Sequence, residues 1–254
     1  MAGAADRTRA AGPGGRPQRT SVWLDGTARR GRSARRAEQP SGLGRDRITE
    51  VSVRLLDAEG LARFSMRRLA TELNVTAMSL YWYVDTKDDL LELALDAAFG
   101  EIALPAAGAA RDWRAELRAL AGEYRALLVR HPWVSSLVGM FLNIGPHFSD
   151  FSRTVRRVIG GTGLSAGRQR GAIAAVFQFV YGFGTMESLF LVRCAAAGMT
   201  EDAYYGEAVA RAPQGLWRMA DGGGESAASV RQMREKDFGV ALELLVSGIE
   251  ALRR

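Results

Sequence analysis

The sequence has few of the residues that build metal sites and disulfides. Its 254 residues include one cysteine, Cys194, and two histidines, His131 and His147. A single cysteine cannot form a disulfide within the chain, and so few ligands do not make a structural zinc site or an iron–sulfur cluster. We therefore expect no metal, no cofactor and a reducing compartment.

Long apolar runs are also scarce. No apolar segment follows Met1, because the beginning of the chain is rich in Arg, Gly, Ala and Pro, and this predicts a cytoplasmic location rather than secretion. The stretch 171–192 is long enough to cross a membrane, but it contains Gln178 and Glu187. An unpaired carboxylate inside a bilayer is costly, so a buried helix of a bundle is the favoured interpretation and no membrane partner is expected.

The usual patterns of catalytic sites are missing. Neither histidine lies near a Gly-x-Ser-x-Gly motif, so the sequence offers no nucleophile with its base. Residues 160–163 are rich in glycine, but they lack the preceding strand and the following Lys-Ser/Thr of a phosphate-binding loop. We expect that the protein is not an enzyme.

Positive charge is concentrated at the beginning of the chain. Residues 1–44 hold nine arginines and three acidic residues, which accounts for the whole net charge of +6. This segment is rich in glycine and proline and has almost no apolar periodicity, which predicts a disordered basic arm over residues 1–44. One apolar island, Val22 to Leu24, interrupts it, and we interpret the island as a patch that docks on the folded part.

After residue 44 the apolar residues recur at helical spacing, and no strand pattern or internal repeat appears. The predicted fold is all-α, with one domain over 45–104 and a second, helical-bundle domain over 105–254. Residues 198–229 are predicted to form a loop with room for one short helix. Helices are predicted at about 45–60, 66–73, 77–84, 87–102, 112–129, 133–143, 148–159, 165–197 and 230–252.

Two short helices with strong start signals lie within the first domain. Ser65 and Thr76 can each accept hydrogen bonds from the free amides of a helix start, and they are eleven residues apart. Asn74 tolerates the left-handed backbone that a tight exit from the first helix needs. The arrangement predicts a helix-turn-helix, with Leu80 and Trp82 in its core.

Residues 64–91 resemble the DNA-binding domain of the tetracycline-repressor (TetR) family of bacterial regulators. The block Leu80-Tyr-Trp-Tyr-Val84, followed by Lys87 and by Leu90 and Leu91, carries the resemblance. The all-helical remainder is similar, less specifically, to the second domain of that family. The resemblance implies an N-terminal helix-turn-helix DNA-binding domain over 45–104 and a helical-bundle effector-binding and dimerisation domain over 105–254. It also implies a homodimeric repressor that a small effector releases from operator DNA.

The candidate contacts with double-stranded DNA cluster at the second helix of the motif. Its first residues would lie on base edges in the major groove, where small side chains allow close approach. The resemblance implies that Arg67 reaches a guanine edge and that Tyr81 and Tyr83 contact DNA. Lys87 lies in the first turn of a helix, where the helix dipole disfavours a cation, and a phosphate would compensate. The residues at the helix start are Thr76, Ala77, Met78 and Ser79.

The DNA-binding domain is itself acidic. Residues 45–100 contain seven basic and ten acidic residues. Attraction to DNA must then come from elsewhere, and arginine-rich arms can enter the minor groove beside a recognition helix. We therefore expect Arg32, Arg35 and Arg36 of the arm to contact DNA.

An effector site is expected among the helices of the second domain, lined by aromatic, methionine and polar side chains. All the candidate residues are equally compatible with plain core. The stretch 140–146 has no histidine before Gly145, which argues against a tetracycline–magnesium site and favours an apolar or aromatic effector. The candidates are Trp133, Met140, Phe141, Asn143, His147, Phe177, Gln178, Tyr181, Met186 and Glu187.

The predicted helices over 165–197 and 230–252 are more apolar than one face of a monomer requires. Pairing them with their copies would give a four-helix interface in a homodimer. Gly182 and Gly184 would allow close backbone approach there or beside a ligand. Three alternatives stay open: an activator, a ligand-independent regulator with the same fold, and a membrane-surface protein that uses the basic arm.

Overall fold

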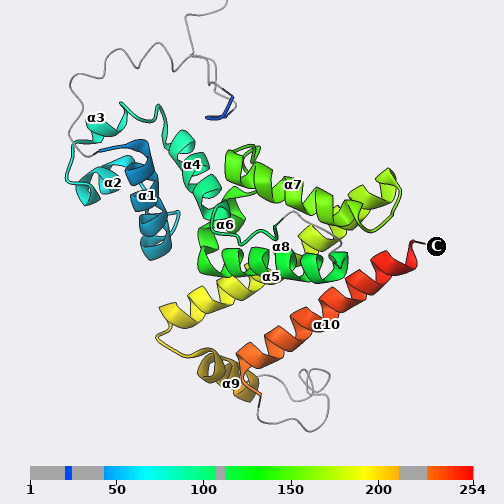
Figure 1. Ribbon diagram of the computed structural model, residues 1–254. Helices are drawn as coiled ribbons and strands as arrows, with labels where there is room; N and C mark the ends of the chain where they lie inside the picture. The colour runs from blue at the N-terminus through cyan, green and yellow to red at the C-terminus, as the bar shows by residue number, and fades with distance from the viewer. Residues whose placement is uncertain (1–20, 25–42, 107–111, 212–227, 254) are drawn as a thin grey trace, which may run out of the picture.

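The computed structural model describes residues 21–24, 43–106, 112–211 and 228–253, and all regular structure in these ranges is helical (Figure 1). The predicted contacts of Arg32, Arg35 and Arg36 lie outside the described residues. The helices are α1 Arg45–Glu59, α2 Met66–Glu72, α3 Ala77–Leu80, α4 Lys87–Phe99, α5 Trp113–Arg130, α6 Pro132–Leu137, α7 Pro146–Gly160, α8 Ala166–Ala196, α9 Glu201–Arg211 and α10 Val230–Ala251.

Helices α1 to α4 form the N-terminal part, and local signals set their ends. The side chains of Ser65, Thr76 and Thr86 each accept a hydrogen bond from a backbone amide of the helix that follows. Gly60 ends α1 with a φ of 76°, and Asn74 adopts a φ of 54° between α2 and α3. The fully buried side chains of this part include Ile48, Leu56, Leu69, Leu80 and Leu90.

The second part is a bundle in which α5 packs along α8. The two backbones lie close together at Gly184, because a Cβ atom there would come within 2.9 Å of the Leu128 side chain. Gly182, by contrast, has no atom within 4 Å of such a position. Gly184 therefore allows close approach to α5 inside the chain, rather than across an interface or beside a ligand, while Gly182 faces outward.

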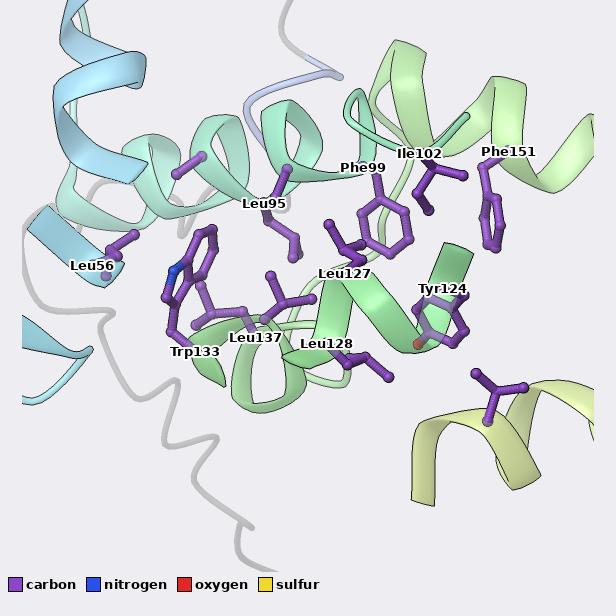
Figure 2. Close-up of a cluster of buried hydrophobic side chains, with 14 of the residues drawn as sticks. Leu56, Leu95, Phe99, Ile102, Tyr124, Leu127, Leu128, Trp133, Leu137 and Phe151 are labelled. Atoms are coloured by element: carbon purple, nitrogen blue, oxygen red, sulfur yellow. The ribbon is translucent and has the colours of Figure 1, made fainter. Parts of the chain in front are cut away.

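One continuous core joins the two parts. Figure 2 shows it running from Leu56 and Trp133 at one end to Tyr124 and Phe151 at the other. Aromatic rings gather at the second end, where the centroids of Phe99 and Phe151 are 5.6 Å apart and those of Tyr124 and Phe151 are also 5.6 Å apart. Helix α4 contributes to both ends, so it is the element that connects the two parts.

Three predicted segments differ from the structure. Helix α3 ends at Leu80 rather than at residue 84, and α6 ends at Leu137 rather than at residue 143. Asn143, with a φ of 49°, interrupts the helical backbone before α7. The arm is not structureless throughout, because Ser21 and Val22 are buried against the fold, as the predicted docking of the apolar island requires.

Among the described residues, α8 is the one helix long and apolar enough to cross a membrane by length and composition. Its inner face packs on α5 and α10 through Val176, Val180 and Gly184. Such packing is typical of a helix in a bundle. The outer face of α8 is not covered by other described residues and exposes Met186 and Leu189.

Candidate nucleic-acid interface

The helix-turn-helix consists of α2 and α3, held at one end of the molecule (Figure 1). Thr76 caps α3 by accepting from the Ser79 amide at 3.2 Å, and the two hydroxyl groups share a further hydrogen bond of 2.8 Å. Leu80 is fully buried and fixes α3 on the core. The start of α3 therefore has a rigid position, with Thr76 exposed and Ala77 and Ser79 partly exposed.

Large apolar side chains surround this helix start on the outside. Met78 is 71% exposed, and Tyr81 is exposed as well. Trp82, expected in the core, is 64% exposed. The expectation for Trp82 was wrong because α3 ends at Leu80, and the turn that follows directs Trp82 outward while Val84 closes the core.

The two adjacent arginines of α2 differ in their surroundings. Arg68 pairs with Glu59 at 2.7 Å and with Glu72 at 3.0 Å, so its guanidinium is engaged within the chain. Arg67 is exposed and forms no ion pair with a described residue. Of the two, Arg67 is the one whose guanidinium is available to an external partner.

Two other candidate contacts already have partners within the chain. The Tyr83 hydroxyl donates to the carbonyl oxygen of Leu43 at 2.7 Å, so this tyrosine ties the chain before α1 to the end of the motif. The Lys87 ammonium lies 5.6 Å from the centre of the Phe64 ring. A cation–π contact therefore offsets part of the unfavourable position of Lys87, and DNA is not needed for that.

A hydrogen-bonded cluster joins the N-terminal part to the bundle. The buried His131 ring contacts Asp57 of α1 at 2.7 Å and Glu101 after α4 at 3.0 Å. Trp133 donates to the same Asp57 oxygen at 2.7 Å. Burial acts to lower the pKa of His131, but its hydrogen bonds to Asp57 and Glu101 outweigh this and raise it above the ordinary value.

The same cluster acts on Glu101. Burial would raise the pKa of the Glu101 carboxyl, but hydrogen bonds from His131 and Arg130 hold it below its usual value. His131, between two carboxylates, thus links α1 and the end of α4 to the start of α6.

The predicted effector residues do not converge on one cavity. Trp133 is buried in the seam between the N-terminal part and the bundle, beside the His131 cluster, and Met140 is exposed. Phe141 and Asn143 line a small space beside α4. His147 is exposed and lines a groove of about 700 Å³ that faces α1. These residues therefore lie between the two parts rather than inside the bundle.

The candidates on α8 separate into inward and outward residues. Glu187 forms a buried ion pair with Arg125, at 2.7 Å, and Arg125 also pairs with Glu235 of α10. Tyr181 donates to the carbonyl oxygen of Ser135 at 2.9 Å.

Of the candidate residues on this helix, only Phe177 joins the aromatic cluster, 5.6 Å from Tyr124 and 5.4 Å from Phe151. Gln178 and Met186 are exposed.

Gln178 and Met186 belong to an exposed face that runs along α8 and continues on α10. On α8 the residues of this face recur every three or four positions, as one side of a helix does, and those on α10 also share one side. The face contains both small residues and large apolar ones, which suits close packing against another helix. The face, called here the bundle face, consists of Gly171, Ala175, Gln178, Gly182, Met186 and Leu189 on α8 and of Val240, Leu244, Ser247, Gly248 and Ala251 on α10.

Two family descriptions match this arrangement. Residues 48–94 match "Bacterial regulatory proteins, tetR family", and residues 104–253 match "Tetracyclin repressor-like, C-terminal domain". The chain belongs to the TetR family. Members of the TetR family are transcriptional regulators, in agreement with the expectation that this chain is not an enzyme.

Two curated transcriptional regulators are similar to this chain. An HTH-type transcriptional regulator of Saccharopolyspora erythraea is 39% identical over 148 residues, 58% of this chain and 62% of the relative. The HTH-type transcriptional repressor DrrR1 of Streptomyces coeruleorubidus is 39% identical over 152 residues, 60% of this chain and 56% of the relative. The matches thus span less than two thirds of these TetR-family relatives.

A solved structure has the same fold. The Streptomyces coelicolor TetR-family protein ActR, in complex with actinorhodin, superposes with a TM-score of 0.66 at 22% identity, over 84% of this chain and 97% of ActR. At that identity the likeness shows the TetR fold. It does not carry a ligand across.

Proposed function

We propose that this TetR-family chain is a homodimeric regulator that binds double-stranded operator DNA through α2 and α3 and represses transcription. The observation that carries the proposal is α3, whose capped start bears the hydroxyls of Thr76 and Ser79. Met78 within α3, and Tyr81 and Trp82 directly after it, are exposed. Hydroxyls, apolar groups and a helix start are the features that read bases and phosphates in a major groove. The repressor name of DrrR1 supports this direction of regulation.

Homodimerisation is supported by the bundle face. Its exposed apolar side chains include Met186, Leu189 and Leu244, on two helices that pack together within the chain. A second copy would cover both helices at once and form a four-helix interface. Two recognition helices could then reach successive major grooves, about 34 Å apart, of a palindromic operator.

The effector of the proposed repressor would be a small apolar or aromatic molecule. Support comes from the aromatic cluster in which Phe99, Tyr124, Phe148, Phe151 and Phe177 contact one another. An aromatic molecule entering this cluster would have to separate the rings, including Phe99 of α4. Movement of α4 would then change the position of the recognition helices and release the operator.

Selection of bound sequences from random duplex DNA tests the proposal. We expect enrichment of a palindrome whose half-sites are centred about one helical turn apart, since each copy places one helix in a major groove. Failure to enrich any sequence would contradict DNA recognition, and an enriched motif without two-fold symmetry would contradict the dimer.

An activator with the same fold would pass that test. Transcript levels of genes beside the enriched palindrome, compared between a deletion strain and its parent, separate the two outputs. Higher transcript levels in the deletion strain support repression, and lower levels support activation. We place both kinds of regulator in the cytoplasm, without a membrane partner.

The basic arm supplies a second test of DNA binding. The segment Ser21 to Leu24 is docked on the fold. Removing the whole arm would therefore remove both the basic residues and this docked segment. Replacing Arg29, Arg30, Arg32, Arg35 and Arg36 with Ser keeps that segment. Log affinity decreases with log salt, and we expect this dependence to become shallower: the magnitude of the slope should decrease by about 2 to 4, at about 0.9 for each lost phosphate contact. An unchanged slope and affinity would contradict a role of the arm.

A further inference from the structure

A short segment from outside the two matched family domains is seated on α4. Ser21 and Val22 are buried, although the family match begins at residue 48. The Ser21 hydroxyl donates to Oε2 of Glu92, and the Val22 amide donates to the same oxygen at 3.3 Å. Glu92, itself buried in the middle of α4, thereby receives two hydrogen bonds from residues about seventy positions earlier.

Trp23 extends this contact across the seam between the two parts of the molecule. Trp23 is partly buried against the core and lines one small space together with Leu95 and Phe99 of α4 and with Phe141 and Phe148. The space left among these side chains is about 10 Å³, close to what one water molecule needs. The segment therefore adjoins both the helix-turn-helix part and the bundle.

The same seam is already tied by α4 itself. The buried Asp96 carboxylate accepts from the backbone amides of His147 at 3.3 Å and Phe148 at 2.9 Å, at the start of α7. Gly145 leaves no room for a Cβ atom beside that carboxylate. The Phe148 ring in turn lies 4.9 Å from Phe99. Ser21 to Leu24 thus adds contacts where α4 meets the bundle, one layer outside the aromatic cluster.

We propose that Ser21 to Leu24 is an intramolecular strap, and that the surface formed by Glu92, Leu95, Phe99, Phe141 and Phe148 is its docking site. The strap fastens α4 to the segment between α6 and α7 and opposes movement of one part against the other. Its expected effect on operator binding rests on the proposed function, whereas the fastening itself does not. Since the strap packs on Phe99 and Phe148 while the aromatic rings are in contact, it favours the operator-binding arrangement over one with separated rings.

Hydrogen exchange of the full-length chain, followed by mass spectrometry, tests the fastening. In Trp23→Ala, we expect amides of α4 after Glu92 and of residues 141–148 to exchange about 5-fold faster or more, as local opening becomes easier. Helix α10 is the internal reference and should not change. Leu24→Ala is the matched control, because Leu24 belongs to the same segment and is 58% exposed. Unchanged exchange in Trp23→Ala, or equal changes in the control, would overturn the strap.

Substitution of Glu92 tests the docking site from the other side. Burial raises the pKa of the Glu92 carboxyl, against the hydrogen bonds from Ser21 and Val22. A neutral acceptor should therefore serve as well as the carboxylate, so we expect Glu92→Gln to exchange like the parent and Glu92→Ala to exchange like Trp23→Ala. Faster exchange in Glu92→Gln than in Glu92→Ala would contradict this site.

Operator affinity tests the regulatory half of the proposal, with the duplex obtained by selection as the probe. We expect Trp23→Ala to bind it about 5-fold more weakly, at the low end of coupling between sites, with dimerisation unchanged. Equal affinity despite faster exchange would overturn the regulatory half. If the parent chain binds no duplex, the proposed function fails, and hydrogen exchange alone still decides whether the strap exists.

Discussion

The two ends of the molecule both expose large apolar side chains, yet their surroundings differ. At the helix-turn-helix, Met78, Tyr81 and Trp82 stand around a helix of four residues whose first turn carries hydroxyl groups. On the bundle face, Met186 and Leu244 stand on helices of 31 and 22 residues, beside glycine, alanine and serine. Exposure alone therefore does not identify the partner.

The difference teaches that the neighbours of an exposed apolar group decide what it can bind. Small residues along a long helix allow a second helix to approach, which suits another copy of the chain. A capped, short helix with polar groups at its start suits phosphates and base edges. A substitution at one end should therefore weaken binding of that end's partner, DNA or a second copy, and leave binding at the other end unchanged.

The largest effect is expected from a charge on the bundle face. Leu244 is 71% exposed, so Leu244→Arg should leave the folded monomer intact. In a dimer the two arginines would be buried without partners, and we expect the dimer dissociation constant to rise about 100-fold or more. Light scattering at micromolar concentration measures this, with Leu142→Arg on an exposed loop as control. A dimer of unchanged stability would show that the bundle face is not the interface.

The next effect concerns the other end. Trp82→Ala and Met78→Ala should each weaken binding to the selected duplex about 30-fold, within the range for single contacts to bases, and leave the dimer intact. The matched control is Met140→Ala, because Met140 is 69% exposed and Met78 is 71% exposed. Titration of a labelled duplex gives the affinities. Equal losses in Met78→Ala and Met140→Ala would remove the distinction between the two surfaces.

A smaller effect distinguishes the inner side of α8 from its outer side. Glu187 accepts two hydrogen bonds from the buried Arg125, at 2.7 and 3.1 Å. Glu187→Gln weakens this pair, while Glu235 still holds Arg125, so we expect a loss of about 1.5 kcal/mol in the free energy of unfolding. Urea unfolding measures the loss, and dimerisation should not change. Unchanged stability would mean that Glu187 is free to act elsewhere, for example on a ligand.

The smallest effect concerns the link between the ends. Because the pKa of His131 is raised in the folded state, its contribution to stability is complete below pH 6.5, the ordinary value, and is lost as the pH rises through the raised value. We expect the unfolding free energy of the parent to fall between pH 6 and pH 9 by more than that of His131→Asn. Parallel pH profiles would contradict a charged His131 between Asp57 and Glu101.

Local features of this fold could be predicted from the sequence, and long-range ones could not. The caps at Ser65, Thr76 and Thr86 and the left-handed Asn74 depend on groups within a few positions of one another. The apolar island at Val22 was recognisable, but its acceptor Glu92 was not, since no signal joins residues so far apart.

The candidate sites show the same limit. The exposure of Trp82 depends on where α3 ends, and helix ends are the least certain part of a sequence pattern. Glu187 was expected to line an effector site, but it pairs with Arg125. The sequence does not indicate this pairing, because the two residues lie far apart along the chain. The candidate contacts on α3 lie together, whereas the candidate effector residues are scattered over the seam, the bundle core and the bundle face.

The central claim is that two copies bind one operator through α3 while the bundle faces hold them together. Sedimentation of the chain with two duplexes of equal length, one carrying both selected half-sites and one carrying a single half-site, tests this directly. The account predicts two copies on the complete site and an affinity about 100-fold weaker or more for the single half-site, because one of the paired helices loses its groove. Equal affinity for both duplexes, with one copy bound to each, would contradict it.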